Sequence, residues 1–251
     1  MALLDGKVAI VTGGGSGIGQ ATCHFFGRHG AKVVVSDIDE KGSSETVQAI
    51  KDANGDAIFV WADVSNSKDC EALVKVTLEN FGKLDIAFNN AGIGGEANPT
   101  ADYSVENWQK VIDVNLSSVF YCMKYEIPAM LKSGGGAIVN MASILGQVGF
   151  ENSPAYVAAK HGVLGLTKNA ALEYSKQGIR VNSVGPGFIR TPLISELEEN
   201  TQVRDHLISL HPIGRLGEAE EVAELVVWLS SDKASFVTGA YYAIDGGYLA
   251  R

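Results

Sequence analysis

Short runs of apolar, often β-branched residues alternate along the chain with longer segments whose apolar positions repeat every three or four residues. The short runs are typical of strands buried on both faces, and the longer segments are typical of helices that cover a sheet. This alternation predicts one α/β domain with a doubly wound parallel sheet of about seven strands. The expected strands are residues 7–12, 32–37, 57–63, 84–90, 136–143, 179–185 and 240–245, and the expected helices are 17–29, 41–54, 67–81, 104–131, 155–176 and 218–230.

Two connections are longer than the others. Residues 93–103 form a loop after the fourth expected strand, and residues 186–217 separate the sixth strand from the next clear helix. Long connections in compact domains tend to be lids or binding segments, and open α/β sheets bind ligands at the carboxyl ends of their strands. We therefore expect one domain over residues 1–251, with a substrate lid at about 188–214.

Charge and composition exclude several classes of function. The chain carries 29 acidic and 20 basic side chains, a net charge of −9, and has no cluster of Lys and Arg of the kind that binds nucleic acid or anionic lipid. Its three cysteines and five histidines lack metal-ligand spacing, which predicts no metal site. With neither a secretory leader nor an apolar span in the sequence, we expect a cytoplasmic protein.

A glycine-rich loop, TGGGSGIG at residues 12–19, follows the first strand and opens the first helix. Gly13, Gly17 and Gly19 are the glycines of a GxxxGxG pattern, and the commoner GxGxxG is absent. A helix N-terminus offers free N–H groups and a positive dipole to a pyrophosphate, and the absence of side chains permits close approach. The loop predicts a dinucleotide site, although such a loop can also be a tight turn.

Polar residues end the next strands. Asp37 lies 24 residues beyond Gly13, where a carboxylate can accept hydrogen bonds from an adenosine ribose. It could instead cap the following helix, as could Asp39. Asp63 has the same ambiguity, and Asn90 could simply belong to a turn.

A possible catalytic group consists of Ser143, Tyr156 and Lys160. Tyr156 and Lys160 are four residues apart on one expected helix, so both project from the same face. Ser143 closes the fifth strand, at the same edge of the sheet as the glycine loop. A phenol has a pKa near 10, and a neighbouring ammonium favours its ionised form. The three residues predict proton transfer by Tyr156 beside a bound dinucleotide.

With these motifs the chain resembles the short-chain dehydrogenase/reductase family over nearly its whole length. The resemblance rests on TGGGSGIG, Asp63–Val64, NNAG at 89–92, Asn115, Ser143, Tyr156 with Lys160, and Pro186–Gly187. It implies a Rossmann-type sheet of order 3-2-1-4-5-6-7 and a homotetramer or homodimer. It also implies that Tyr156 is the general acid/base, that Ser143 orients the carbonyl, that Lys160 holds the nicotinamide ribose and lowers the pKa of Tyr156, and that Asn115 supports a proton-relay water. The implied cofactor-binding residues are Gly13, Ser16, Gly17, Ile18, Gly19, Asp37, Asp63, Val64, Asn90, Tyr156, Lys160, Pro186, Gly187, Ile189 and Thr191.

The expected function is hydride transfer between NAD(H) and a small neutral secondary alcohol or ketone. Residues 144–155 and the lid residues Leu193, Ile194 and Leu197 could line an apolar pocket without a cation for a charged substrate. NAD(H) is expected because Asp37 would repel a 2′-phosphate and no Arg or Lys occupies positions 14–16 or 38.

Two alternatives remain open. One is reduction of 3-oxoacyl thioesters on an acidic carrier protein, which would favour basic residues at the entrance; the lid instead offers Arg190 and Arg204 against four carboxylates. The other is a dinucleotide-binding protein without catalysis, which the presence of both Tyr156 and Lys160 disfavours.

Overall fold

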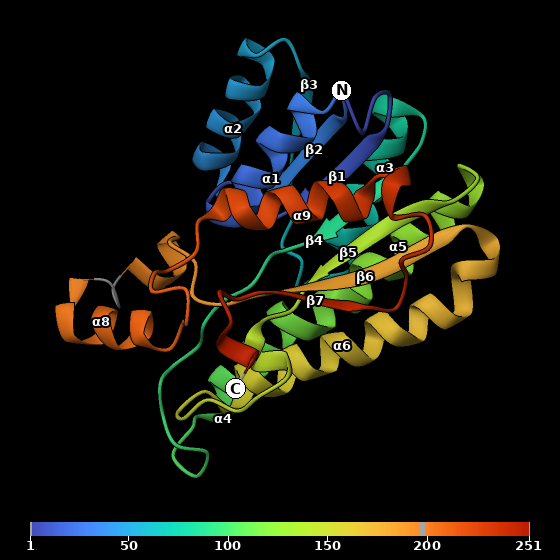
Figure 1. Cartoon of the computed structure of the whole chain (residues 1–251). Helices are drawn as coiled ribbons and strands as arrows, with labels where there is room; N and C mark the ends of the chain where they lie inside the picture. Colours follow the sequence, from blue (N-terminus) through green and yellow to red (C-terminus); the bar gives the residue numbers. More distant parts are fainter. Residues whose placement is uncertain (1, 196–198, 251) are drawn as a thin grey trace.

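A computed structural model describes residues 2–195 and 199–250. Its strands form one parallel sheet in the order β3-β2-β1-β4-β5-β6-β7, which confirms the expected order (Figure 1). The strands are β1 (Val8–Thr12), β2 (Lys32–Asp37), β3 (Asp56–Trp61), β4 (Ile86–Asn89), β5 (Gly136–Met141), β6 (Ile179–Pro186) and β7 (Tyr241–Ile244). The chain folds as a single α/β domain of Rossmann type.

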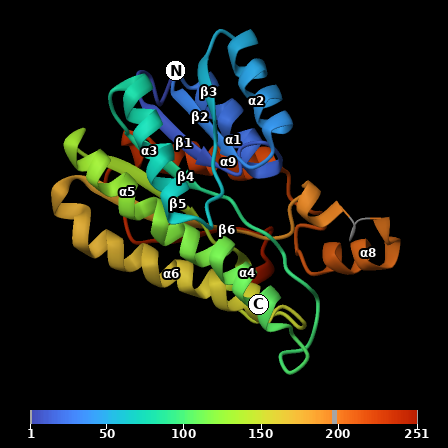
Figure 2. The ribbon, with the colours of Figure 1, turned by 180° about the vertical axis from the view of Figure 1, so that it is seen from behind.

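Helices cover both faces of this sheet. Helices α1, α2 and α9 pack together on one face, and α3, α4, α5 and α6 cover the other, as the two opposite views show (Figures 1 and 2). Helix α8 lies to one side of the sheet, in the connection between β6 and α9. The bounds are α1 (Gly17–Arg28), α2 (Glu40–Asp52), α3 (Ser67–Phe81), α4 (Val105–Ile112), α5 (Ser118–Lys132), α6 (Pro154–Tyr174), α8 (Thr201–Ser209) and α9 (Ala219–Ser230).

Alternation along each strand divides the core into two layers. In β1, Ala9 and Val11 face the layer that contains Phe26 of α1, whereas Ile10 faces the layer that contains Val119 of α5. All five residues of β1 are buried. Because both faces are apolar, the strand reads in the sequence as an uninterrupted apolar run, which is the signal that predicted a covered parallel sheet.

Two expected elements differ from the structure. The helix expected over 104–131 is divided into α4 and α5 by a π-helical turn, Asp113–Ser117, which directs the buried side chain of Asn115 inward. Such a turn inserts one residue into the helix and leaves the apolar spacing almost unchanged, so periodicity does not reveal it. The long connection after β6 contains a 3₁₀ turn, Pro192–Ile194, and helix α8, neither of which was assigned bounds from the sequence.

Part of the expected lid lies outside the described residues, namely residues 196–198, which include Leu197. Ile194 and Leu207 of the lid form a small apolar cluster with Leu216, which follows it. None of the helices built from residues 2–195 and 199–250 combines the length and apolar character that a membrane span needs.

A polar network crosses the core beneath β4 and β5. Glu126 of α5 is 1% exposed, and its Oε2 accepts a hydrogen bond from Nδ2 of Asn89 at 3.1 Å. Asn89 also donates to Asn140 at 3.0 Å, and Asn140 donates to Thr167 of α6 at 3.0 Å. Glu126 Oε1 and Asn89 Oδ1 are both acceptors without a partner, so a proton on the carboxyl would supply the missing donor. Burial raises the pKa of Glu126 to about 8, and the bond from Asn89 only partly opposes this.

We expect Glu126 to make stability decline with rising pH. The unfolded carboxyl ionises near pH 4.5, whereas the folded one stays protonated to about pH 8. The raised pKa therefore makes its full contribution to the free energy of unfolding below pH 4.5, and this contribution is lost progressively between pH 4.5 and 8. The total loss is on the order of 4–5 kcal/mol, and the free energy of unfolding does not fall further on this account above pH 8. Glu126→Gln keeps the shape and cannot ionise, so its Tm should exceed that of the wild type at pH 8 and match it near pH 4.5.

Thermal unfolding at equal protein concentration from pH 4.5 to 8.5 measures this effect, with the exposed Glu71→Gln as the matched control. Parallel Tm curves for the wild type and Glu126→Gln would show that the carboxyl does not carry its proton in the folded protein.

Candidate active site

One cavity of about 660 Å³ lies along the carboxyl edge of the sheet. Because neighbouring strands are parallel and in register, Thr12 of β1 pairs with Ser36 of β2, so the segments that follow the strands emerge side by side. The cavity is lined by all but one of the residues predicted for catalysis and cofactor binding: Gly13, Ser16, Gly17, Ile18, Asp37, Asp63, Val64, Asn90, Asn115, Ser143, Tyr156, Lys160, Pro186, Gly187, Ile189 and Thr191.

Gly19 is the exception. A Cβ at this position would overlap the carbonyl oxygen of Gly13, so the glycine lets α1 pack directly on the loop that precedes it. A Cβ at Gly13 would lie 2.8 Å from Nδ2 of Asn90. That amide donates to the carbonyl oxygens of Thr12 at 2.9 Å and of Gly13 at 3.2 Å. Asn90 therefore braces the loop from β4, which is more than a turn residue does.

The N-terminus of α1 opens into the cavity at Ser16 and Gly17. Ser16 is the N-cap residue, yet its exposed side chain makes no capping hydrogen bond, and the first turn contains no acidic residue. Gly17 has φ +53°, and a Cβ there would meet the methyl group of Thr191 at 3.2 Å. The free N–H groups and the positive end of the helix dipole suit a phosphate group at this point.

Asp37 is fixed at the far end of the cavity from Ser143. Its Oδ2 accepts a hydrogen bond from the Gly15 N–H at 3.0 Å, and its Oδ1 accepts from the N–H groups of Ile38 and Asp39. Asp39 caps α2 through the Lys41 N–H, so Asp37 is not the helix cap. Its carboxylate ties β2 to the glycine loop and borders the space beside it.

Asp63 and Val64 continue the wall of this end of the cavity after β3. Asp63 accepts hydrogen bonds from the Ser65 N–H at 3.0 Å and the Ser65 hydroxyl at 2.7 Å. The cap of α3 is Asn66, so Asp63 is not the capping residue either.

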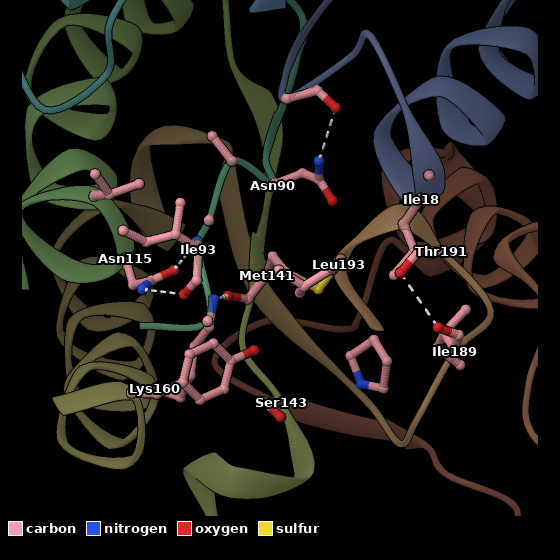
Figure 3. Close-up of a pocket in the computed structure, with 18 of the residues that line it drawn as sticks. Ile18, Asn90, Ile93, Asn115, Met141, Ser143, Lys160, Ile189, Thr191 and Leu193 are labelled. Carbon is pink, nitrogen blue, oxygen red and sulfur yellow. Dashed lines mark hydrogen bonds between the residues drawn. The ribbon is translucent and has the colours of Figure 1, made fainter. Parts of the chain in front are cut away.

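Tyr156 and Lys160 of α6 line the opposite end of the cavity together with Ser143. Figure 3 shows Lys160 and Ser143 at this end. The Ser143 side chain lies within reach of the Tyr156 hydroxyl, and its Oγ accepts a hydrogen bond from the Leu145 N–H at 3.2 Å. The Lys160 ammonium lies 5.4 Å from the centre of the Tyr156 ring and donates to the Met141 carbonyl oxygen at 2.8 Å. Lys160 is 2% exposed, so a single backbone oxygen replaces most of its hydration.

Burial changes the proton affinity of both groups in the structure. It raises the pKa of Tyr156, although the nearby Ser143 side chain acts in the opposite direction. It lowers the pKa of Lys160 to about 7. Burial is the largest influence on the pKa of Tyr156 in this structure, and the lowering of that pKa by Lys160 stays a prediction.

Asn115 joins the π-helical turn to the segment after β4. Its Oδ1 accepts from the Ile93 N–H at 3.0 Å, and its Nδ2 donates to the Ile93 carbonyl oxygen at 2.8 Å (Figure 3). A Cβ at Gly92 would lie 2.5 Å from Asn115 Oδ1 and 3.7 Å from Lys160 Nζ. The side chains of Asn115 and Lys160 thus meet at a glycine, beside Tyr156.

Comparisons with known proteins agree with this geometry. The family model described as enoyl-(acyl carrier protein) reductase matches residues 13–249. A cyclohexanol dehydrogenase of Acinetobacter sp. (strain SE19) is 53% identical, covering 98% of this chain and 96% of that protein. This chain belongs to the short-chain dehydrogenase/reductase family.

Solved members of the short-chain dehydrogenase/reductase family share the whole fold. The crystal structure of levodione reductase has a TM-score of 0.95 and 38% identity, covering 98% of this chain and 99% of that one. Carveol dehydrogenase from Mycobacterium avium, in complex with NAD, has a TM-score of 0.96 and 27% identity, covering 100% of both chains. The chain is therefore an oxidoreductase whose cofactor is a nicotinamide dinucleotide.

The cavity of this short-chain dehydrogenase/reductase fits such a group. It offers an anion-binding helix N-terminus, a backbone cradle at Gly13 and Gly17 that Cβ atoms would obstruct, and a polar cluster at Ser143. Within residues 2–195 and 199–250, no three His, Cys, Asp or Glu side chains gather in a way that could hold a metal ion.

Tyr241 of β7 supports the site, although it is not among the predicted site residues. Its hydroxyl donates to the Ser143 carbonyl oxygen at 3.2 Å. Its ring lies against Gly185 of β6, where any Cβ would overlap it. Tyr241 and Ser143 are 98 positions apart in the chain, and only strand pairing brings them together.

Proposed function

We propose that this enzyme transfers a hydride between NAD(H) and a neutral secondary alcohol or ketone, with a six-membered carbocycle as the preferred skeleton. The observation that supports this most is the Ser143–Tyr156–Lys160 cluster opening onto apolar side chains. Relatives named for cyclohexanol, for cis-4-hydroxycyclohexanecarboxylate and for levodione are 53%, 45% and 40% identical to this chain.

In this proposal the chain supplies proton transfer and orientation. A bound nicotinamide would supply the hydride acceptor or donor. Tyr156 exchanges the proton of the substrate hydroxyl, and Ser143, which lines the same end of the cavity, orients the same oxygen. Lys160 holds the ribose next to the nicotinamide, while Asn115 keeps the Ile93 segment in place beside Lys160.

The substrate end of the cavity is mainly apolar. Ile144, Leu145 and Phe150 contribute from the segment after β5, and Leu193 and Ile194 contribute from the lid. The expectation of a pocket without a cation needs correction, since the exposed Lys110 of α4 also lines the cavity. An exposed ammonium stays solvated, so it adds little affinity for a neutral ring.

The carrier-protein alternative receives little support from the entrance. Arg190 lies 2.8 Å from the carboxylate of Glu218, and Arg204 lies 3.2 Å from that of Asp205. Because these two cations already face carboxylates, they present a weak field to an acidic partner. The family model's description refers to acyl-carrier substrates, so thioesters remain the second candidate and belong in the test.

Tyr156→Phe tests the proposed reaction directly. The change removes the proton-exchanging hydroxyl and little packing, so kcat with NAD and cyclohexanol should fall by roughly 10²- to 10⁴-fold. Dinucleotide affinity should stay within about threefold, because the phenol contributes little binding energy. Tyr125→Phe is the matched control, since the Tyr125 hydroxyl contacts Ser67 and the residue does not line the cavity.

Steady-state kinetics with cyclic alcohols, linear alcohols, hydroxy acids and 3-hydroxyacyl thioesters measure substrate preference. Turnover of thioesters or charged hydroxy acids alone would contradict the proposed substrate class. A Tyr156→Phe variant with wild-type kcat would contradict the proposed role of the phenol.

The preference for NAD(H) over NADP(H) is proposed from Asp37. Solved relatives hold NAD in one case and NADP in another, so the choice depends on this chain's own residues. In this proposal the carboxylate of Asp37 would face a 2′-phosphate, and two like charges at ~4 Å cost up to about 4 kcal/mol at an effective dielectric constant of 20. Among the described residues that line the cavity, the cations are Lys110 and Lys160. Lys41, close to Asp37 in sequence, is exposed and faces Glu45 at 4.0 Å.

We expect the wild type to prefer NAD(H) by at least about tenfold in kcat/KM, well within the repulsion estimated above. Asp37→Asn removes the charge and keeps an oxygen for the Gly15 N–H, so it should improve the use of NADP(H) with the loop intact. Asp37→Ala also removes that bond and should lower kcat/KM for NAD(H) further. Equal use of both cofactors by the wild type would contradict the proposed role of the carboxylate.

We also propose a homotetramer, with a homodimer as the smaller alternative, in the cytoplasm. The support comes from apolar side chains that the single chain leaves exposed. Val119, Val163 and Leu164 are buried within one chain, whereas Phe120 stays 48% exposed. Tyr241, Tyr242 and Tyr248 have contacts within the chain, so they give the proposal no support. Further exposed apolar side chains are Val105, Leu172 and Phe236. The three cysteines are free and buried, which suits a reducing compartment.

Light scattering at micromolar concentration checks the assembly. We expect a mass about four times the 26.5 kDa of one chain, because exposed aromatic and aliphatic side chains gain most from burial between subunits. Phe120→Glu should lower that mass, and Glu71→Gln should leave it unchanged. A monomer mass for the wild type would contradict the proposal.

A further inference from the structure

His211 lies behind the cavity wall, two residues after helix α8 ends. The side chain is 3% exposed. Its Nδ1 lies 2.8 Å from the Leu207 carbonyl oxygen, in the last turns of α8. Its Nε2 lies 3.2 Å from the backbone nitrogen of Phe188, which follows β6. One imidazole ring therefore connects the lid helix with the segment that lines the cavity.

The two partners determine the protonation state of the ring. A backbone N–H can only donate, so Nε2 must be the acceptor for Phe188. A carbonyl oxygen can only accept, so Nδ1 must carry the hydrogen that bonds to Leu207. The neutral ring protonated at Nδ1 satisfies both contacts. A doubly protonated ring would point a second donor at the Phe188 N–H.

The space around the ring is closely matched to it. A Cβ at Gly187 would lie 2.6 Å from Nε2, so the glycine admits the imidazole. The ring of Phe188 stands edge-on to His211 with centroids 5.8 Å apart, and Tyr248 lies at 5.6 Å on another side. The backbone of Asp245 also lies next to Gly187, so the turn after β7 closes this side. Gly187 and Phe188 both line the cavity.

We propose that His211 is a positioning residue that holds the main chain at Gly187 and Phe188 in the shape needed to bind dinucleotide and substrate. It acts through those two residues and does not line the cavity itself. The proposal rests on the function proposed above only in treating this cavity as the active site. Losing the ring's acceptor leaves the N–H of Phe188 without a partner, so the segment shifts or opens to water.

Two variants separate the hydrogen bonds from the packing. His211→Phe keeps an aromatic ring between Phe188 and Tyr248 and removes both hydrogen bonds. His211→Gln can place its amide oxygen near the Nε2 position and accept again from the Phe188 N–H. His206→Gln is the matched control, because His206 is an exposed histidine of the same helix.

The first measurement is hydrogen–deuterium exchange of peptides that contain Phe188, with and without NAD. In His211→Phe the Phe188 amide should exchange about tenfold faster, as expected for a lost hydrogen bond. His211→Gln should restore most of the protection, and His206→Gln should leave it unchanged. If His211→Phe does not fold, His211→Leu takes its place, since it is also apolar and offers no acceptor to the Phe188 N–H. Faster Phe188 exchange in His211→Leu that His211→Gln restores supports the proposal, and wild-type exchange in His211→Leu overturns it.

The second measurement is kinetic and uses the same variants. His211→Phe should raise the Kd for NAD and the KM for cyclohexanol by about five- to tenfold, with kcat within about threefold, because the proton-transfer groups are untouched. Unchanged Kd, KM and Phe188 exchange in His211→Phe would overturn the proposal. A wild type that does not oxidise any alcohol would contradict the proposed function alone, since amide exchange and the Kd for NAD still test His211.

Discussion

The in-register parallel pairing of β1 with β2 and β4 determines where every part of the cavity lies. The backbone hydrogen bonds between these strands align the strand ends, so Thr12, Asp37 and Asn89 lie at one edge of the sheet. The segments beyond these residues carry the glycine loop, the acidic end of the cavity and Asn90. A shift of one residue between β1 and β4 would reverse which side chains face each core layer and would remove the brace from Asn90 to the loop.

Close approach of the backbone is the second constraint, and glycine provides it at several points. Gly19 lets α1 contact the carbonyl of Gly13, Gly92 makes room for Asn115, and Gly187 admits His211. In each case the space left by a missing side chain is filled by a polar group that makes a specific hydrogen bond elsewhere. The glycines thus make room for the hydrogen-bonded polar groups that hold the site together, as well as for a ligand.

Burial controls the electrostatics of the same region. It raises the pKa of Tyr156 and Glu126 and lowers that of Lys160, which favours the neutral form of all three groups. A protonated Glu126 carboxyl can donate the hydrogen bond that Asn89 Oδ1 lacks in the core. Lys160, with a pKa of about 7, can change its charge near neutral pH. The low dielectric of the interior therefore makes the protonation state of the site sensitive to any charge that binds beside it.

The sequence alone determined the strand order, through family resemblance, and the locations of nearly all elements. It could do so because buried parallel strands are continuous apolar runs and helices have a different period. It also located the loop glycines, Asp37 and the cluster of Ser143, Tyr156 and Lys160, since these depend on residue type and local spacing.

Only the tertiary structure decided the rest. It distinguished Asp37 from the cap residue Asp39, revealed the π-helical turn at Asn115 and showed that burial raises the pKa of Tyr156. It also brought Tyr241 to Ser143 and His211 to Phe188. These features arise from contacts between residues far apart in the chain and from the solvation that those contacts remove, and neither leaves a periodic signal in the sequence.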